Sequence, residues 1–185
     1  MSLIPVLQLS SLPEKGRVLD MLFEPCEVLR SFLIAALLSH NETYDSYEQF
    51  IEAARTLLLE FLARAELEAS SGKPLDPKIS KIIAAHPRLG APKPSQPGEK
   101  LSEHSAAEQK SLADAAEQLG FWNEQYEQTF PGLRYVVFVN GRSREVIMKN
   151  MKARIERGDI KKERVEAFNA MCDIAHDRAR KAKLW

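Results

Sequence analysis

The spacing of apolar residues is the feature that most constrains what this chain can fold into. Apolar side chains recur three and four positions apart through most of the sequence, and glycines and prolines fall mainly between these runs. This spacing matches the 3.6 residues per turn of an α-helix, whereas a half-buried strand alternates at every second residue. The pattern therefore predicts an all-α fold.

Start and stop signals divide the pattern into about eight helices. Ser46, Ser143 and Asp159 are expected N-caps, and Gly158 is expected to end a helix. The expected helices cover residues 11–23, 25–37, 46–70, 76–86, 102–119 (or 105–119), 121–129, 143–157 and 159–185. A chain of 185 residues has the length of one domain. We therefore expect residues 1–185 to form a single helical bundle.

Two segments interrupt the helical pattern. Residues 87–101 hold four prolines and two glycines and cannot form regular structure. A loop of this length inside a compact domain is commonly functional. Tyr135–Val139 is rich in β-branched and aromatic residues, but it has no convincing partner strand. It is closed by the turn dipeptide Asn140-Gly141, so we expect a short extended segment buried among helices.

Composition and charge exclude several classes of protein. The 26 basic and 26 acidic residues cancel, which argues against a nucleic-acid partner. The apolar stretch Ser31–Asn41 is far shorter than the roughly 20 residues that span a bilayer, so no membrane partner is expected. Two cysteines are too few for a disulfide framework. The N-terminus lacks the pattern of a secretory signal, and Trp185 does not fit a peroxisomal address; we expect a cytoplasmic protein, with the peroxisome as the alternative.

Three polar residues occupy positions where the helical pattern requires apolar ones. His86 lies three residues after Ile83, on the isoleucine face of the helix before the long loop. Glu108 lies four residues before Leu112, on the apolar face of the helix after that loop. Arg178 occupies one turn of the apolar stripe of the last helix. Burying such groups without partners costs several kcal/mol, so each is a candidate functional residue.

Each candidate also has a structural explanation. The histidine could be a satisfied core residue, and Glu108 could complete a capping box with Ser105. Arg178 could pair with Asp177 or Glu166 at the surface, or extend its charged end into solvent along an apolar surface. Taken together, however, an imidazole, a carboxylate and a guanidinium around one loop make a general acid/base pair with an anion anchor.

These residues resemble a known family. The segments His86-Pro87-Arg88-Leu89-Gly90, Ser105-Ala106-Ala107-Glu108-Gln109 and Tyr135–Val139, followed by the inward Arg178, are similar to the 2-oxo-4-hydroxy-4-carboxy-5-ureidoimidazoline (OHCU) decarboxylases of urate degradation. The similarity extends roughly over residues 12–182, and the opening of the chain resembles the fungal branch. Some family members have Asp-Leu-Ala where this chain has Arg-Leu-Gly after the His-Pro pair.

The resemblance implies a carboxy-lyase that converts OHCU to (S)-allantoin and carbon dioxide. It also implies a homodimer that needs no cofactor and no metal. It carries over His86 as the catalytic acid/base, with Glu108 as the second member of the catalytic pair. The implied substrate contacts are Pro87, Ser105, Gln109, Tyr135, Val136, Val137, Phe138, Val139 and Arg178.

The chemistry is consistent with these residue types. Loss of carbon dioxide leaves an electron pair that the conjugated ring of the substrate can hold, so no cofactor is needed as an electron sink. The protein must orient the substrate and deliver a proton. With an ordinary pKa of about 6.5, His86 would exchange that proton at neutral pH.

Two other classes remain as alternatives. A helical metalloprotein could combine His86 with His104 and Glu108 on one ion. A di-iron bundle would require paired Glu-x-x-His motifs, and the nearest match is the lone Asp173-x-x-His176. A non-enzymatic alternative is a helical interaction module that uses the proline-rich loop, or an inactive homologue without decarboxylase activity.

Overall fold

The computed structural model confirms the all-α prediction. It describes residues 9, 13, 15–39, 42–90 and 116–182. The helices in this part of the chain are α1 (Lys15–Leu22), α2 (Glu27–Leu37), α3 (Tyr47–Ser70), α4 (Pro77–Ala84), α6 (Ala116–Thr129), α7 (Arg144–Arg157) and α8 (Ile160–Lys181). The described residues contain no strand. None of their helices is both long and apolar enough to cross a membrane.

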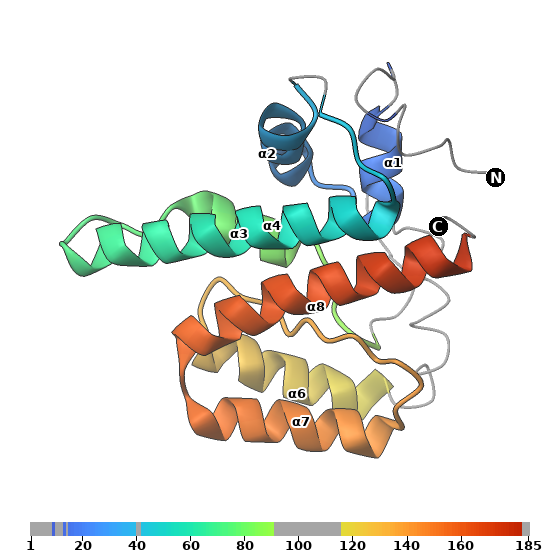
Figure 1. Ribbon diagram of the computed structural model, residues 1–185. Helices are drawn as coiled ribbons and strands as arrows, with labels where there is room; N and C mark the ends of the chain where they lie inside the picture. The colour runs from blue at the N-terminus through green and yellow to red at the C-terminus, as the bar shows by residue number, and fades with distance from the viewer. Residues whose placement is uncertain (1–8, 10–12, 14, 40–41, 91–115, 183–185) are drawn as a thin grey trace.

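The last helix lies at the centre of the molecule. In Figure 1, α8 runs alongside α3, with α1 and α2 on one side of this pair and α6 and α7 on the other. Helix α8 also contacts α1 and α4, while α6 packs against α7. Because α8 is enclosed in this way, a polar side chain on its inner face lies in the core.

The predicted helix caps are confirmed. Ser46, Ser143 and Asp159 each accept a hydrogen bond from a backbone amide in the first turn of the helix that follows. Gly158 ends α7 with a φ of 63°, in the left-handed region that favours glycine. Helix α2 begins slightly later than expected, at Glu27, because Cys26 is its extended N-cap residue.

The predicted helix break at Gly120 is wrong. Helix α6 continues through this residue from Ala116 to Thr129. A glycine inside a helix costs up to about 1 kcal/mol relative to alanine. Leu119 and Tyr126 on α6 are buried, as is Phe130 directly after it, and their packing outweighs that cost.

The segment Tyr135–Val139 has no regular secondary structure and pairs with no strand among the described residues, as predicted. Tyr135 and Val136 are buried, and the remaining three residues pack against the core. The turn that follows has φ values of 47° at Asn140 and 69° at Gly141, as a type I′ turn requires. The segment is thus fixed by its core contacts and by this turn, without a strand partner among the described residues.

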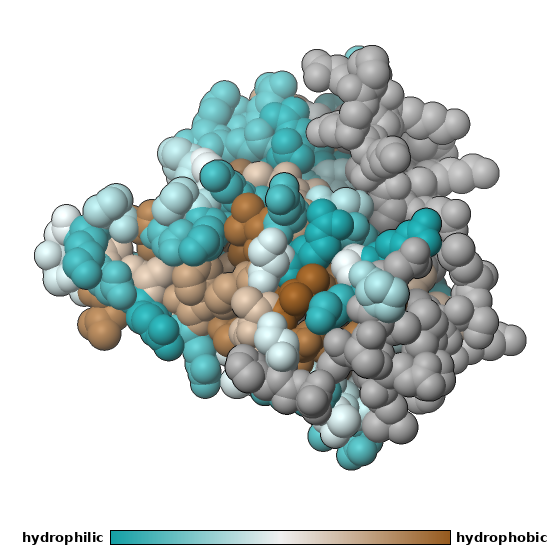
Figure 2. Space-filling view, turned by 90° about the horizontal axis from the view of Figure 1, so that it is seen from above, coloured by the Kyte–Doolittle hydropathy of each residue, from teal (hydrophilic) through white to brown (hydrophobic). Residues whose placement is uncertain are grey.

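The interior is apolar and the surface mixed. On the face shown in Figure 2, hydrophilic residues cover most of the described surface, and hydrophobic residues show in a band across its middle. Within the core, buried polar and charged residues are exceptions that need an explanation. They are Glu24, His86, Asn123, Arg154, Glu163 and Arg178.

Candidate functional site

His86 lies in the core just after α4, on the face predicted from the isoleucine spacing. It is 5% exposed, and Ile79, Ile82 and Ile83 of α4 are buried with it. Neither ring nitrogen, Nδ1 or Nε2, has a hydrogen-bond partner among the described residues. A buried polar atom left without a partner costs about 1–3 kcal/mol. The described residues therefore do not supply what a satisfied core histidine needs.

The surroundings of His86 lower its pKa to about 4. Burial is the main cause, because it disfavours the charged imidazolium. The Glu24 carboxylate raises the pKa, and the guanidinium groups of Arg178 and Arg134 lower it. His86 is therefore neutral at pH 7, and its ring resists protonation more than the ordinary histidine that the sequence analysis assumed.

Arg178 is buried in an ion pair with Glu24. Its Nη2 atom lies 2.6 Å from Oε1 of Glu24, and its Nη1 donates to the carbonyl of Leu22 over 3.3 Å. Both side chains are almost fully buried, so the alternative of a surface pair with Asp177 or Glu166 is wrong. The anion that the sequence required for Arg178 is supplied, at least in part, by the protein itself.

Glu24 is a site residue that the sequence analysis missed. It lies between α1 and α2, where no helical spacing applies. One signal was available: a carboxylate stands between Phe23, which is buried, and Pro25. Both Glu24 and Arg178 act electrostatically on the His86 ring, so these three residues form one cluster.

The residue just before the extended segment contacts this cluster. Arg134, which precedes Tyr135, donates from Nη1 to the carbonyl of His86 over 3.0 Å. Arg154 donates to the carbonyl of Val136 over 3.2 Å, and the Arg142 guanidinium donates to the carbonyls of Phe138 and Val139. The arginines thus occupy carbonyls of the segment.

Several backbone amides of the segment have no acceptor among the described residues. Within the described ranges, the backbone amides of Val136, Val137, Phe138 and Val139 donate no hydrogen bond. Three of these residues also line a cavity of about 360 Å³ between the segment and helices α7 and α8. Neither His86 nor Arg178 lines that cavity. Pro87, a predicted substrate contact, is partly buried directly after His86.

A second buried polar group centres on Glu163, which the sequence analysis also missed. Its carboxylate accepts from the Tyr126 hydroxyl at 2.6 Å, from Nε of Arg154 at 2.7 Å and from Nη2 of Arg157 at 2.5 Å. Burial and the bond to Glu163 raise the pKa of Tyr126. Since Arg154 also bonds the carbonyl of Val136, this network anchors the extended segment. A signal was present, because Glu163 shares a helix face with Ala167 and Ala170.

Three predicted site residues, Ser105, Glu108 and Gln109, lie outside the described residues, as does His104. The two residues of the Asp173-x-x-His176 motif have partners of their own. Asp173 pairs with Arg55, and Nε2 of His176 lies 2.6 Å from Oε1 of Glu52. In the part of the chain that the structure describes, no group of three or more His, Cys, Asp or Glu side chains could hold a metal ion.

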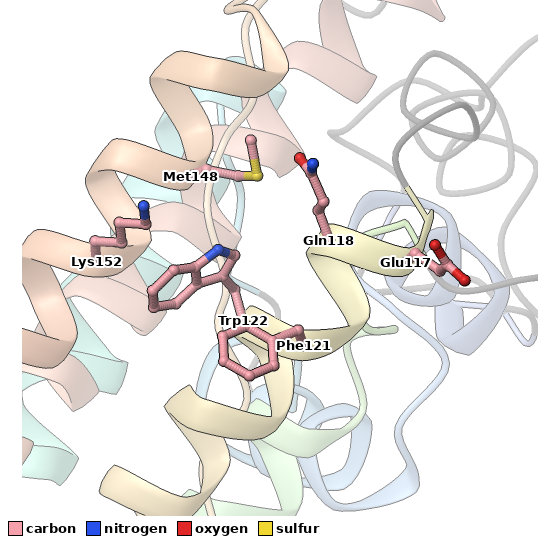
Figure 3. Close-up of a pocket in the computed structure, with 6 residues that line it drawn as sticks. All are labelled: Glu117, Gln118, Phe121, Trp122, Met148 and Lys152. Carbon is pink, nitrogen blue, oxygen red and sulfur yellow. The ribbon is translucent and has the colours of Figure 1, made fainter.

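A further pocket lies between α6 and α7, and none of its residues was predicted (Figure 3). Its volume is about 550 Å³, and Lys152 Nζ lies 4.5 Å from the centre of the Trp122 ring. The lining residues are Glu117, Gln118, Phe121, Trp122, Met148 and Lys152. Its lining is separate from the His86 cluster.

One comparison with known proteins gives a match. A family model described as OHCU decarboxylase matches residues 10–180. No curated protein and no solved structure matches the chain. The match covers most of the sequence and includes His86, Glu24 and Arg178.

Proposed function

The chain belongs to the OHCU decarboxylase family, and from this membership we propose that it converts OHCU to (S)-allantoin and carbon dioxide in urate degradation. One observation of the structure carries the proposal. It is the buried His86 imidazole, whose two nitrogens have no partner among the described residues and which lies in the field of the Arg178-Glu24 pair.

The reaction breaks the bond between the ring and the carboxylate. Carbon dioxide leaves, and the bonding electron pair passes into the conjugated C=N bond of the substrate ring. A proton must then reach a ring carbon on one face only, and water supplies the net proton that the reaction takes up. A neutral imidazole suits this step, because it can accept the proton of the substrate hydroxyl and return it to the carbon.

The remaining residues position the substrate. Glu108 is the proposed catalytic partner of His86, and Pro87, Ser105 and Gln109 are proposed substrate contacts on the strength of the resemblance. The amides of residues 136–139 can donate to ring oxygens of the substrate. Because Glu24 neutralises Arg178, we infer that the guanidinium binds a carbonyl or shares the substrate carboxylate, rather than acting as an isolated positive charge.

We also propose that the protein works as a homodimer without a cofactor. These two properties, together with the cytoplasmic location and its peroxisomal alternative, rest on the sequence and on the resemblance.

The proposal is tested by the handedness of the product. OHCU is generated in situ from urate, and allantoin formation is followed by circular dichroism with and without the protein. The expected result is a signal from (S)-allantoin that grows with protein concentration, whereas spontaneous decay gives no optical preference. Product without optical activity, formed at the rate of the protein-free control, would overturn the proposed function.

A further inference from the structure

The turn that carries His86 is held from outside by one face of α6. Leu119, Asn123 and Glu127 are spaced four residues apart, so they lie on the same side of that helix. All three contact the turn of residues 86–90. We refer to Leu119, Asn123 and Glu127 together as the α6 face.

Asn123 makes the central contact. Its side chain is 2% exposed, and its Nδ2 atom donates to the carbonyl of Leu89 over 2.9 Å. This bond joins the middle of α6 to a residue three positions after His86. A buried amide whose bond ends on a turn carbonyl holds the backbone of that turn in place.

Glu127 holds the same turn one helical turn further along. Arg88 donates from Nε to Oε1 of Glu127 over 2.8 Å, and from Nη2 to Oε2 over 2.5 Å. Two parallel bonds between a guanidinium and a carboxylate fix orientation as well as distance. The pair is only partly buried, since the side chains of Arg88 and Glu127 are 39% and 26% exposed.

Leu119 fits the turn by close approach. Gly90 has a φ of 71°, and a Cβ atom at this position would lie 2.7 Å from Cδ1 of Leu119. Only glycine allows both the backbone conformation and the contact. At the start of the turn, the His86 amide donates to the carbonyl of Ile83 at 3.2 Å, and its carbonyl accepts from Arg134. The backbone on both sides of the imidazole is therefore fixed.

We propose that the α6 face is a positioning device for the imidazole of His86, with Asn123 and the Arg88-Glu127 pair as positioning residues for the proposed decarboxylation. The proposal rests on the proposed function. Its physical basis is that no described side chain hydrogen-bonds the ring, so in the described part of the chain the ring is positioned by its packing and by the backbone that carries it. A misplacement of about 1 Å at a catalytic group can lower a rate by about 100-fold.

The first test replaces Asn123 by leucine, which removes the donor. We expect Asn123→Leu to lower kcat about 10- to 100-fold and to change KM for OHCU less than about threefold, because the ring is displaced while substrate contacts remain. The pKa of His86, measured by NMR and assigned with His86→Gln, should rise toward about 6.5 as water reaches the loosened turn. The matched control is Gln128→Leu, which changes an exposed amide on the same helix and should leave both readouts unchanged.

The second test exchanges the charges of the ion pair. Arg88→Glu and Glu127→Arg should each lower kcat, and the double variant should recover much of the loss, because the two charges attract again. This pair lies near the surface, so these variants test the proposal even if Asn123→Leu does not fold.

Two results would overturn the positioning role. One is a folded Asn123→Leu protein with the kcat and His86 titration of the wild type. The other is a charge-exchanged double variant no more active than its single parents. If the wild-type protein gives no chiral allantoin, the proposed function fails instead. The titration of His86 then still tests the α6 face: a His86 pKa that is unchanged in Asn123→Leu and in both single charge variants would refute the positioning role.

Discussion

At the scale of single residues, His86 and Glu24 differ in how much the sequence could reveal of them. His86 was predictable because it stands on a helical stripe of isoleucines, where a polar residue breaks a regular pattern. Glu24 lies between two helices, where there is no helical spacing of apolar residues for a polar residue to interrupt. The sequence required an anion for Arg178, but only the packing of α1 against α8 brings this carboxylate to it.

The role of His86 is tested by His86→Gln. Glutamine retains some hydrogen bonding but cannot exchange a proton near neutral pH. If His86 moves the proton that sets product chirality, stereospecific turnover should fall by about 10²–10⁴, with the helical circular dichroism spectrum unchanged. Unchanged stereospecific turnover would remove His86 from the mechanism.

The Glu24-Arg178 pair makes a distinct prediction about stability. Removing one member of a buried ion pair leaves the other charge uncompensated, which costs about 3–5 kcal/mol, whereas replacing both by apolar residues can be neutral or stabilising. We therefore expect Glu24→Leu and Arg178→Met each to lower the free energy of unfolding strongly, and the double variant to be more stable than either. Urea unfolding measures the free energy of unfolding of the wild type, the two single variants and the double variant. A double variant as unstable as the sum of the single variants would show that the two charges do not compensate each other.

At the scale of helices, the wrongly predicted break at Gly120 conceals the inward position of Asn123. A break at Gly120 would separate Asn123 from the face of Leu119, whereas the continuous helix α6 places both residues on one buried face. Gly158 does end a helix, and the N-cap Asp159 follows it directly, whereas the residues after Gly120 continue the buried face of α6. The turn after His86 also depends on packing against α6. Some family members have Asp and Ala at positions 88 and 90; here Arg88 pairs with Glu127, and Gly90 allows the close approach of Leu119.

Gly120→Ala tests this interpretation of α6. A Cβ atom at position 120 would have no neighbour within 4 Å, and the backbone there is helical. Alanine should raise the free energy of unfolding by about 0.5–1 kcal/mol, because it restricts the unfolded chain without strain in the folded one. Gly90→Ala is the matched comparison and should destabilise the protein, given its positive φ and the contact with Leu119. Thermal unfolding of both variants shows whether each substitution raises or lowers the stability of the protein. A loss of stability in Gly120→Ala would contradict the interpretation of α6 as one continuous helix.

At the scale of the whole molecule, the helical period predicted the fold class and most helix ends, but not how the helices pack. That α3 lies along α8, more than 100 residues later, depends on side chains meeting in three dimensions. The same holds for the buried network of Glu163, whose partners come from α6 and α7. Sequence spacing identifies inward faces; it does not say which faces meet.

The pKa of His86 makes the stability of the whole protein depend on pH. The folded-state pKa is about 4, below the unfolded value of about 6.5. Above pH 6.5 the ring is neutral in both states and contributes no pH dependence. As the pH falls from 6.5 to 4, the unfolded chain takes up a proton that the folded protein does not, so stability falls by about 3 kcal/mol from this group. Urea unfolding across this range should show a smaller loss for His86→Gln; identical curves would show that His86 is not buried in its neutral form.

The ion pair between Glu24 and Arg178 joins residues 154 positions apart. Glu24 follows the first helix, and Arg178 belongs to the final turns of the last one. During synthesis, the carboxylate therefore emerges from the ribosome long before its guanidinium exists. A nascent chain that stops short of α8 has to keep Glu24 hydrated, and the core around it cannot close. Completion of the site therefore waits for the synthesis of α8, long after the helices on either side of Glu24 have been made.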